Sequence, residues 1–165
     1  MMPKTTAAPA LVLRSEQPAD AQAIETLLDH AFGPGRFAKA SERVREVAEF
    51  RPGLSICAFE ADRLVGSVRM WRVHVGVQPA IFLGPLAVES DARSSGIGAV
   101  LVETACQAAE ATGFPVVLLV GDVPYFGKFG FSADHTAQVR LPGPVDQRRV
   151  LARGAAAPLS GPAGA

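Results

Sequence analysis

The hydrophobic pattern of this chain changes near its middle, from the period of β-strands to the period of a helix. Three apolar runs come first, at 54–60, 64–75 and 80–88, and short polar turns separate them, which is typical of an antiparallel meander. Residues 94–112 then place apolar side chains at helical spacing, and 115–120 form a further apolar run. Because a strand–helix–strand succession crosses over with a right hand, we expect the strands at 80–88 and 115–120 to be parallel and candidate neighbours.

The flanking segments complete an α+β plan. Pro18 and Asp20 provide helix-start chemistry before apolar positions at helical spacing, and the breakers at 32–35 end that helix. We also expect a strand at 11–14, a helix at 38–50, a short helix at 124–129 and a strand from Phe131. In terms of domains, we expect a flexible tail at 1–10, one folded domain at 11–153, and a disordered Ala/Pro/Gly-rich tail at 154–165.

Composition excludes several classes of function. Sixteen Lys and Arg residues balance sixteen Asp and Glu residues, so a net charge of zero gives no support to nucleic-acid binding. Cys57 and Cys106 lie in separate apolar runs outside any CxxC or Cys/His pattern, so we expect two buried, reduced thiols and no metal site. The N-terminus lacks a signal peptide's apolar core, and the apolar runs fall short of the roughly 20 residues that span a bilayer. We therefore expect a soluble, cytoplasmic protein without a membrane partner.

The polar segment before the long helix is the most informative one for function. It reads Arg93-Ser94-Ser95-Gly96-Ile97-Gly98. The first turn of a helix offers unpaired N–H groups and the positive end of the helix dipole, and small residues let a phosphate approach the backbone closely. Arg93 adds a positive charge, so this loop is a candidate diphosphate site. The alternative is an ordinary strand-to-helix turn, because a G-x-G pattern alone is weak.

Two other phosphate loops fit less well. No Lys follows Gly96 or Gly98, as a P-loop requires, and Leu101 stands where the third glycine of a Rossmann fingerprint belongs. Asp122 lies roughly where a ribose-binding acid would, which keeps a nicotinamide-dinucleotide-binding protein as a less favoured hypothesis. The meander before the loop argues against that doubly wound fold.

The pattern Arg93-x-x-Gly96-x-Gly98 after an apolar strand resembles the acetyl-CoA signature of the GNAT family of N-acetyltransferases. The segments DHAFGPGR (29–36), RLVGSVRMWRV (63–73), FLGPLAV (82–88) and LLVGDVPYFGKFGF (118–131) are similar to the YhbS type of predicted acetyltransferase within that family. The resemblance implies a single-domain GNAT fold of the α+β (α/β) class. Its mixed central sheet would have about six to seven strands, with an antiparallel N-terminal meander, a parallel splayed strand pair and helices on both faces.

The resemblance also implies a CoA site. Acetyl-CoA would be the co-substrate, with no metal, and its pantetheine arm would enter the splay beside the backbone of Leu86, Ala87 and Val88. The N–H of Leu86 would stabilise the oxyanion of the thioester carbonyl, and Gly84-Pro85 would form the bulge that begins the splay. The remaining implied contacts to CoA are Arg93, Ser94, Ser95, Gly96, Ile97, Gly98, Phe126 and Lys128.

The catalytic groups are less well defined by the sequence. The family's general acid is a Tyr four residues before the Gly of a Tyr-x-x-x-Gly-Phe segment, a position that Phe126 occupies here, with Tyr125 one residue earlier. Because one residue turns a helical side chain by about 100°, three hypotheses stay open: Tyr125 substitutes as the acid, the thiolate leaves without a protein acid, or catalysis is lost. His74 is a candidate base by its side-chain pKa, and Asp122 is a candidate site residue or a helix cap.

The acceptor site is implied only in outline. The loop between the first two helices borders the acceptor cleft in GNAT folds, so Phe32 and Arg36 are candidates there. Trp71 is expected in the core, and the alternative is that it lines the acceptor pocket. The leading hypothesis is an enzyme that transfers an acetyl or other acyl group to an unidentified amine by direct attack in a ternary complex. The alternative is a non-catalytic acyl-CoA sensor, which Phe126 motivates. A homodimer is a further expectation by analogy.

Overall fold

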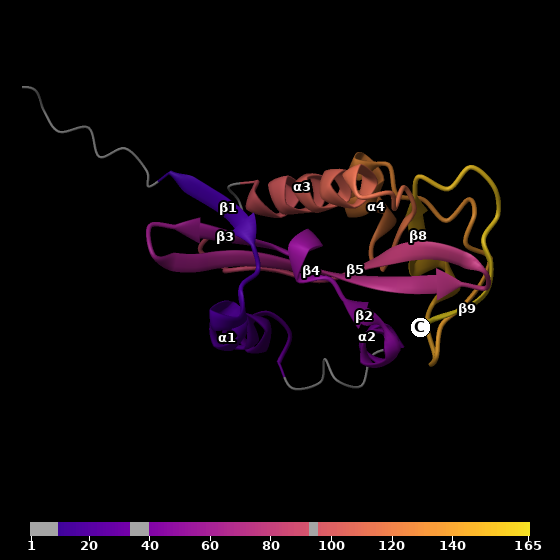
Figure 1. Ribbon diagram of the computed structural model, residues 1–165, viewed down its shortest axis with the longest axis horizontal. Helices are drawn as coiled ribbons and strands as arrows, with labels where there is room; N and C mark the ends of the chain where they lie inside the picture. The colour runs from indigo at the N-terminus through magenta and orange to yellow at the C-terminus, as the bar shows by residue number, and fades with distance from the viewer. Residues whose placement is uncertain (1–9, 34–39, 93–95) are drawn as a thin grey trace, which may run out of the picture.

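The computed structural model describes residues 10–33, 40–92 and 96–165. Within these residues nine strands belong to one sheet, and its main path runs β1-β3-β4-β5-β6-β8 (Figure 1). The strands are β1 (Leu11–Ser15), β2 (Glu49–Phe50), β3 (Ile56–Glu60), β4 (Arg63–Val75), β5 (Gln78–Val88), β6 (Val117–Val120), β7 (Gln138–Arg140), β8 (Val150–Arg153) and β9 (Ser160–Gly164). The helices are α1 (Ala21–Phe32), α2 (Ala40–Val47), α3 (Ile97–Ala111) and α4 (Val123–Phe126), which runs into the short 3₁₀ helix η5 (Gly127–Phe129).

The sheet has the mixed topology that the sequence predicts. Strands β3, β4 and β5 form the antiparallel meander, and β1 extends it by pairing antiparallel to β3. Strand β5 then pairs parallel to β6, after the crossover through α3. The expected meander and the expected parallel neighbours are therefore confirmed.

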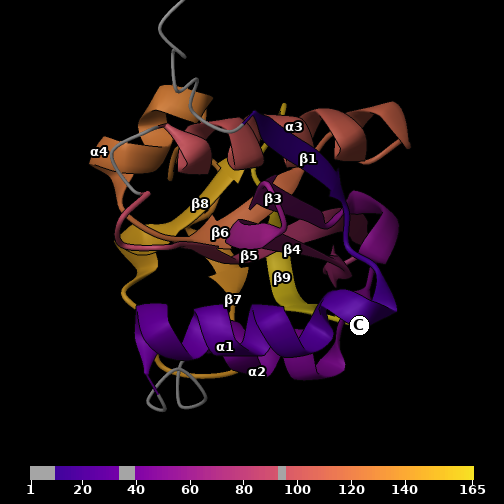
Figure 2. The ribbon, with the colours of Figure 1, turned by 90° about the vertical axis from the view of Figure 1, so that its left-hand side faces the viewer.

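Helices cover both faces of the sheet. Figure 2 shows α1 and α2 on one face and α3 and α4 on the other. Strand β5 is buried on both sides, since Ile81 and Leu83 belong to the core cluster that includes α3, whereas Phe82 packs in a cluster with Val44 of α2. A continuous apolar strand is what burial on both faces requires.

The C-terminal segment differs from the expectation. Residues 154–165 are not a disordered tail, because Ser160–Gly164 forms β9, which pairs with β4 and β7. Two glycines make this contact possible: a Cβ on Gly161 would lie 2.8 Å from the Cα of Gly76. The Ser-Gly-Pro-Ala-Gly sequence lacks the β-branched residues that identify strands, so the pairing arises from the open edge of β4 rather than from local propensity. Together with the short β2 and β7, it brings the sheet to nine strands instead of six or seven.

Two further expectations concern the tail and the thiols. Residues 1–9 of the predicted N-terminal tail lie outside the described residues. Cys57 and Cys106 are both buried free cysteines, as expected, and burial raises the pKa of their thiols to about 12 and about 11. None of the helices in the described ranges is long and apolar enough to span a membrane.

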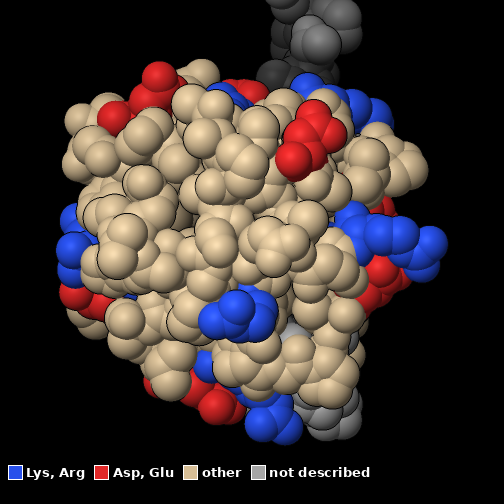
Figure 3. Space-filling model, turned by 90° about the vertical axis from the view of Figure 1, so that its right-hand side faces the viewer, with Lys and Arg blue, Asp and Glu red and all other residues tan. Residues whose placement is uncertain are grey.

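Surface charge is dispersed on the face that carries the end of the β4–β5 hairpin and β9. Figure 3 shows that most of the centre of that face is uncharged and that Lys, Arg, Asp and Glu side chains lie mainly around its edge, where basic and acidic groups adjoin in several places. Among the described residues drawn there, no basic stripe of the kind that follows a nucleic-acid backbone is visible.

Candidate functional site

The site begins where β5 and β6 stop pairing. Their parallel register comprises only Ile81 with Val117 and Phe82 with Leu118. Strand β5 continues to Val88, but beyond Phe82 it has no parallel partner among the strands that the structure describes. The two strands therefore diverge toward their C-terminal ends, which confirms the predicted splay and opens a space in the middle of the sheet.

A bulge in β5 marks the start of the splay. The register with β4 shifts by one residue between the pairs Val68–Leu86 and Met70–Leu83, at the predicted Gly84-Pro85 position. The indole Nε1 of Trp71 donates a hydrogen bond of 2.6 Å to the carbonyl oxygen of Gly84. Trp71 packs against the core, as expected, and it lines neither described hollow of the splay, where the alternative placed it. Its hydrogen bond to Gly84 stabilises the bulge from outside the two hollows.

A groove of about 730 Å³ runs along the outer end of the splay. The N-terminus of α3 borders it: Gly96 is the N-cap in a left-handed conformation with φ +79°, and a Cβ built on it meets no atom within 4 Å. The lining residues are Ala31, Phe32, Leu86, Ala87, Val88, Gly96, Gly98, Ala99, Tyr125, Lys128 and Phe129. The predicted contacts Arg93, Ser94 and Ser95 lie outside the described residues, and the side chain of Ile97 is buried in the core rather than in the groove.

Tyr125 and Phe126 point to different sides of α4. The Tyr125 hydroxyl lies over the first turn of α3, 2.7 Å from where a Cβ on Gly98 would be. Burial raises the pKa of Tyr125, so the phenol keeps its proton at neutral pH. The Phe126 ring instead covers Gly121, where a Cβ would lie 2.6 Å from its Cδ2. The expected one-residue rotation is present, and it separates the phenol from the position where the family carries its acid.

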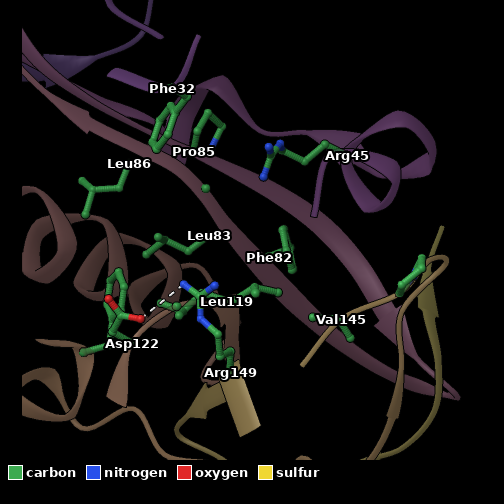
Figure 4. Close-up of a pocket in the computed structure, with 15 residues that line it drawn as sticks. Phe32, Arg45, Phe82, Leu83, Pro85, Leu86, Leu119, Asp122, Val145 and Arg149 are labelled. Carbon is green, nitrogen blue, oxygen red and sulfur yellow. Dashed lines mark ion pairs between the residues drawn. The ribbon is translucent and has the colours of Figure 1, made fainter. Parts of the chain in front are cut away.

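A second hollow lies deeper in the splay and is called the inner cavity below. It measures about 440 Å³ and shares Phe32 and Leu86 with the groove, so the two spaces adjoin (Figure 4). Most of its wall is apolar. The lining residues are Phe32, Arg45, Phe82, Leu83, Gly84, Pro85, Leu86, Leu119, Val120, Gly121, Asp122, Phe126, Pro144, Val145 and Arg149.

Three charged side chains line the inner cavity. Arg45 comes from α2, and its Nε and Nη2 donate to Glu42 at 3.2 and 2.7 Å. Asp122 ends β6 and forms an ion pair with Arg149, with Oδ1 and Nη2 3.3 Å apart. Sequence reasoning found Asp122 but missed both arginines, because no motif surrounds them and only the tertiary fold brings α2 and the segment before β8 to the splay.

One expected residue does not reach the site, and a second cannot be placed. His74 pairs with Pro79 and Gly164 at the opposite end of β4 from the splay, so the structure does not support it as a base acting there. Arg36 lies outside the described residues. No group of three or more His, Cys, Asp or Glu side chains in the described part of the chain could hold a metal ion.

Comparison with known proteins agrees with the family resemblance found in the sequence. The model of the acetyltransferase (GNAT) family matches residues 21–131. A protein of Escherichia coli K12 called uncharacterized N-acetyltransferase YhbS is 29% identical over 137 residues, which are 81% of each chain.

Solved structures agree on the fold. The chain is similar to the crystal structure of Escherichia coli YhbS in complex with CoA, with a TM-score of 0.77, 24% identity, and coverage of 97% of this chain and 92% of the other. It is also similar to a GNAT acetyltransferase of Brucella melitensis in complex with acetyl-CoA, with a TM-score of 0.63, 22% identity, and coverage of 75% and 84%. At such identities the two likenesses establish the fold.

Proposed function

This chain belongs to the acetyltransferase (GNAT) family, and from that premise we propose that it transfers an acetyl or other acyl group from acyl-CoA to an amine. The family resemblance and the fold predicted from the sequence are both confirmed. The mixed sheet with its antiparallel meander rules out the doubly wound dinucleotide-binding fold. One observation carries the proposal: β5 and β6 separate after Phe82 and Leu118, and the resulting opening ends at a glycine-bordered helix start.

The groove suits the CoA end of the substrate. The backbone at Gly96 leaves room for a diphosphate at the positive end of the 15-residue α3, whereas the space beside Gly98 is taken by the Tyr125 hydroxyl. Lys128 lines the same groove, with its Nζ 5.7 Å from the centre of the Tyr125 ring, and supplies a cation for a phosphate. The pantetheine arm would follow Leu86 to Val88, and the thioester would reach the point where groove and inner cavity adjoin.

The reaction requires the amine to approach from the inner cavity. The amine nitrogen bonds to the thioester carbon, the carbon–sulfur bond breaks, the amine loses a proton, and the thiolate gains one. The N–H of Leu86 is the candidate donor to the oxyanion. Asp122 is the carboxylate that lines the inner cavity within the described residues, so it is the candidate to attract the ammonium form and accept its proton.

Tyr125 is the candidate to supply the proton that the thiolate gains. Phe126 has no proton to donate, whereas the phenol of Tyr125 lines the groove and keeps its proton. Release of CoA can be followed with a thiol-reactive dye, using acetyl-CoA and a panel of primary amines. The proposal predicts binding of acetyl-CoA by calorimetry and CoA release that depends on an amine.

A non-catalytic acyl-CoA sensor is the second candidate, because Phe126 stands in the family's acid position. A sensor would bind acetyl-CoA with the same groove and release no CoA with any amine of the panel. The identity of the acceptor, a homodimer and the cytoplasmic location stay predictions.

A further inference from the structure

Most of the residues that line the inner cavity are apolar. Strands β5 and β6 form one side of it through Phe82, Leu83 and Leu119, which are 1%, 3% and 1% exposed. These side chains also belong to the core clusters of the domain, so close packing fixes their positions before a ligand binds. Phe32 and Val145 extend this apolar wall. The cavity is therefore a preformed apolar site, which is the usual environment of a small-molecule ligand.

The charged side chains of the cavity are neutralised within the chain. Among the described residues, each charged side chain that lines the cavity has a partner of opposite charge. Arg45 donates two hydrogen bonds of 3.2 and 2.7 Å to Glu42, and Arg149 lies 3.3 Å from the carboxylate of Asp122. A second charge on a bound molecule would have to displace one of these partners or lose its water without compensation. The wall therefore favours a ligand whose body carries no charge.

The two ends of the cavity differ in what they adjoin. Phe32 and Leu86 line both the groove and the cavity, so the thioester of the proposed complex lies at this end. Phe82 and Val145 line the cavity but not the groove. Figure 4 shows Val145 on the other side of the hollow from Leu86. A molecule whose nitrogen attacks the thioester beside Leu86 would thus place the rest of its body along Phe82 and toward Val145.

We propose that the acceptor is a primary amine on an uncharged apolar body, an alkyl or arylalkyl amine, and that the inner cavity binds this body. The inference rests on the proposed function for the fate of the amine. The nitrogen would lie at the end next to the groove, and the body would replace water along Phe82 and Val145. The products would be an N-substituted amide and free CoA, and the proton lost by the nitrogen balances the one that the thiolate gains. Diamines and amino acids would be poor acceptors, because their second charge would be buried against an apolar wall.

The first test varies the length of the apolar body alone. With acetyl-CoA at saturation, CoA release is measured with the unbranched primary amines from ethylamine to hexylamine, which have nearly equal basicity. Burial of one CH₂ group corresponds to about a four-fold change in binding. We expect kcat/KM to rise about four-fold with each added CH₂ until the chain fills the cavity. Equal values across the series would overturn the inference.

The second test adds a charge to the far end of the body without changing its shape. Pentylamine is compared with 1,4-diaminobutane, which replaces the terminal methyl group by an ammonium group. In the same way, 5-methylhexylamine is compared with 5-aminopentanoate, which replaces an isopropyl group by a carboxylate. We expect kcat/KM to favour the apolar member of each pair by about ten-fold or more. A charged member that equals or exceeds its apolar counterpart would refute the proposal.

The third test assigns the preference to the cavity. Val145→Phe would fill the end of the cavity away from the groove, so it should reduce the kcat/KM ratio of hexylamine to ethylamine about ten-fold and leave calorimetric binding of acetyl-CoA unchanged. Val77→Phe is the matched control, because Val77 is 97% exposed in the turn before β5, at the opposite end of that strand from the splay. Val145→Thr keeps the shape of the side chain and adds a hydroxyl, so it decides the matter if Val145→Phe does not fold. It should reduce the same ratio about three-fold or more, and an unchanged ratio would contradict the proposal.

Two further measurements separate this inference from others. Binding of ethylamine and hexylamine to the CoA-bound protein is measured by calorimetry, without turnover. Tighter binding of hexylamine that is lost in Val145→Phe, together with no CoA release, would refute the enzyme and retain the apolar site. The second measurement compares acetyl-CoA with hexanoyl-CoA, using ethylamine as the acceptor. A gain with chain length that depends on Val145 in this acyl series, but is absent from the amine series, would place the apolar chain on the acyl group and refute the acceptor claim.

Discussion

Gly121 offers a direct test of how the wall of the inner cavity is packed. A Cβ on this residue would lie 2.6 Å from Cδ2 of Phe126, closer still to Cε2, and 3.1 Å from Cδ1 of Leu119. Ordinary van der Waals contact begins at 3.4 Å, so the Phe126 ring must retreat by at least about 0.8 Å to accept Gly121→Ala. The ring cannot simply swing aside, because it packs edge-on against Tyr125 and Phe131.

The expected cost follows from overpacking, which typically destabilises a core by about 1–3 kcal/mol. For a domain of this length, each kcal/mol lowers Tm by about 2–4 °C. Gly121→Ala should therefore lower Tm, measured by circular dichroism, by about 2–12 °C. It should also reduce CoA release, because the displaced ring enters the inner cavity.

Gly127 provides the matched control. It lies in the segment that follows α4, has helical dihedrals (φ −58°, ψ −29°), and would present a Cβ that meets nothing within 4 Å. Gly127→Ala should therefore stabilise the protein by about 0.4–1 kcal/mol through the unfolded state.

A double variant isolates the contact itself. In the background Phe126→Ala, the additional change Gly121→Ala should hardly change the free energy of unfolding, because the ring atoms that the new Cβ would meet are gone. The coupling energy between the two changes should therefore be about 1–3 kcal/mol. Two results would contradict this packing: a Tm for Gly121→Ala equal to that of the parent, or an equal loss of unfolding free energy with and without the Phe126 ring. In either case Phe126 does not pack on Gly121, and the described wall of the cavity is wrong.

Four other outcomes are expected. Gly96→Val should weaken acetyl-CoA binding sharply in calorimetry, because its side chain would enter the groove from a left-handed position that β-branched residues avoid; unchanged affinity would remove the diphosphate assignment. Tyr125→Phe should lower kcat across the pH range if the phenol is the acid, and equal rates at every pH would eliminate that role. Trp71→Phe should cost about 1–3 kcal/mol in denaturant unfolding, because the bulge carbonyl loses its half-buried donor. The hydrogen bond from Arg14 lowers the pKa of Asp20, so the stabilisation from this pair is present above about pH 4 and is lost as the pH falls through the lowered folded pKa; Asp20→Asn should therefore lower Tm at pH 7, and the difference from the parent should shrink as the pH falls below about 4.

The fold was largely predictable because its main elements carry strong periodic signals. The meander and the parallel pair follow from apolar runs of strand length and from one long helix between two of them. Strand β9 could not be found in this way, since Pro162 and the glycines beside it carry no strand propensity. Its position is fixed by the edge of β4 beyond β3, which is a property of the assembled sheet.

Some residues of the candidate site could likewise be predicted from local sequence motifs, whereas others are brought to the site only by the tertiary fold. Residues that belong to short continuous motifs were found from spacing and resemblance, and Leu86 to Val88, Gly96 and Gly98 border the groove. Arg45 and Arg149 lie more than a hundred residues apart and belong to no motif, so only the packing of α2 opposite the segment before β8 joins them. Trp71 has the core position that the sequence favoured, but no local pattern indicates that its indole N–H donates to the backbone of the bulge.

The two hollows separate the two proton transfers that acyl transfer requires. The sulfur departs with CoA and must be protonated from the groove, whereas the amine arrives through the inner cavity and must lose its proton there. The start of α4 serves both spaces: Asp122 is its N-cap and lines the inner cavity, and Tyr125 lies one turn later and lines the groove. Phe126 fills the wall between them with a ring that exchanges no proton. If the proposed roles hold, a chain with Phe126 in place of the family's tyrosine has its candidate acid, Tyr125, in the groove and its candidate base, Asp122, in the inner cavity.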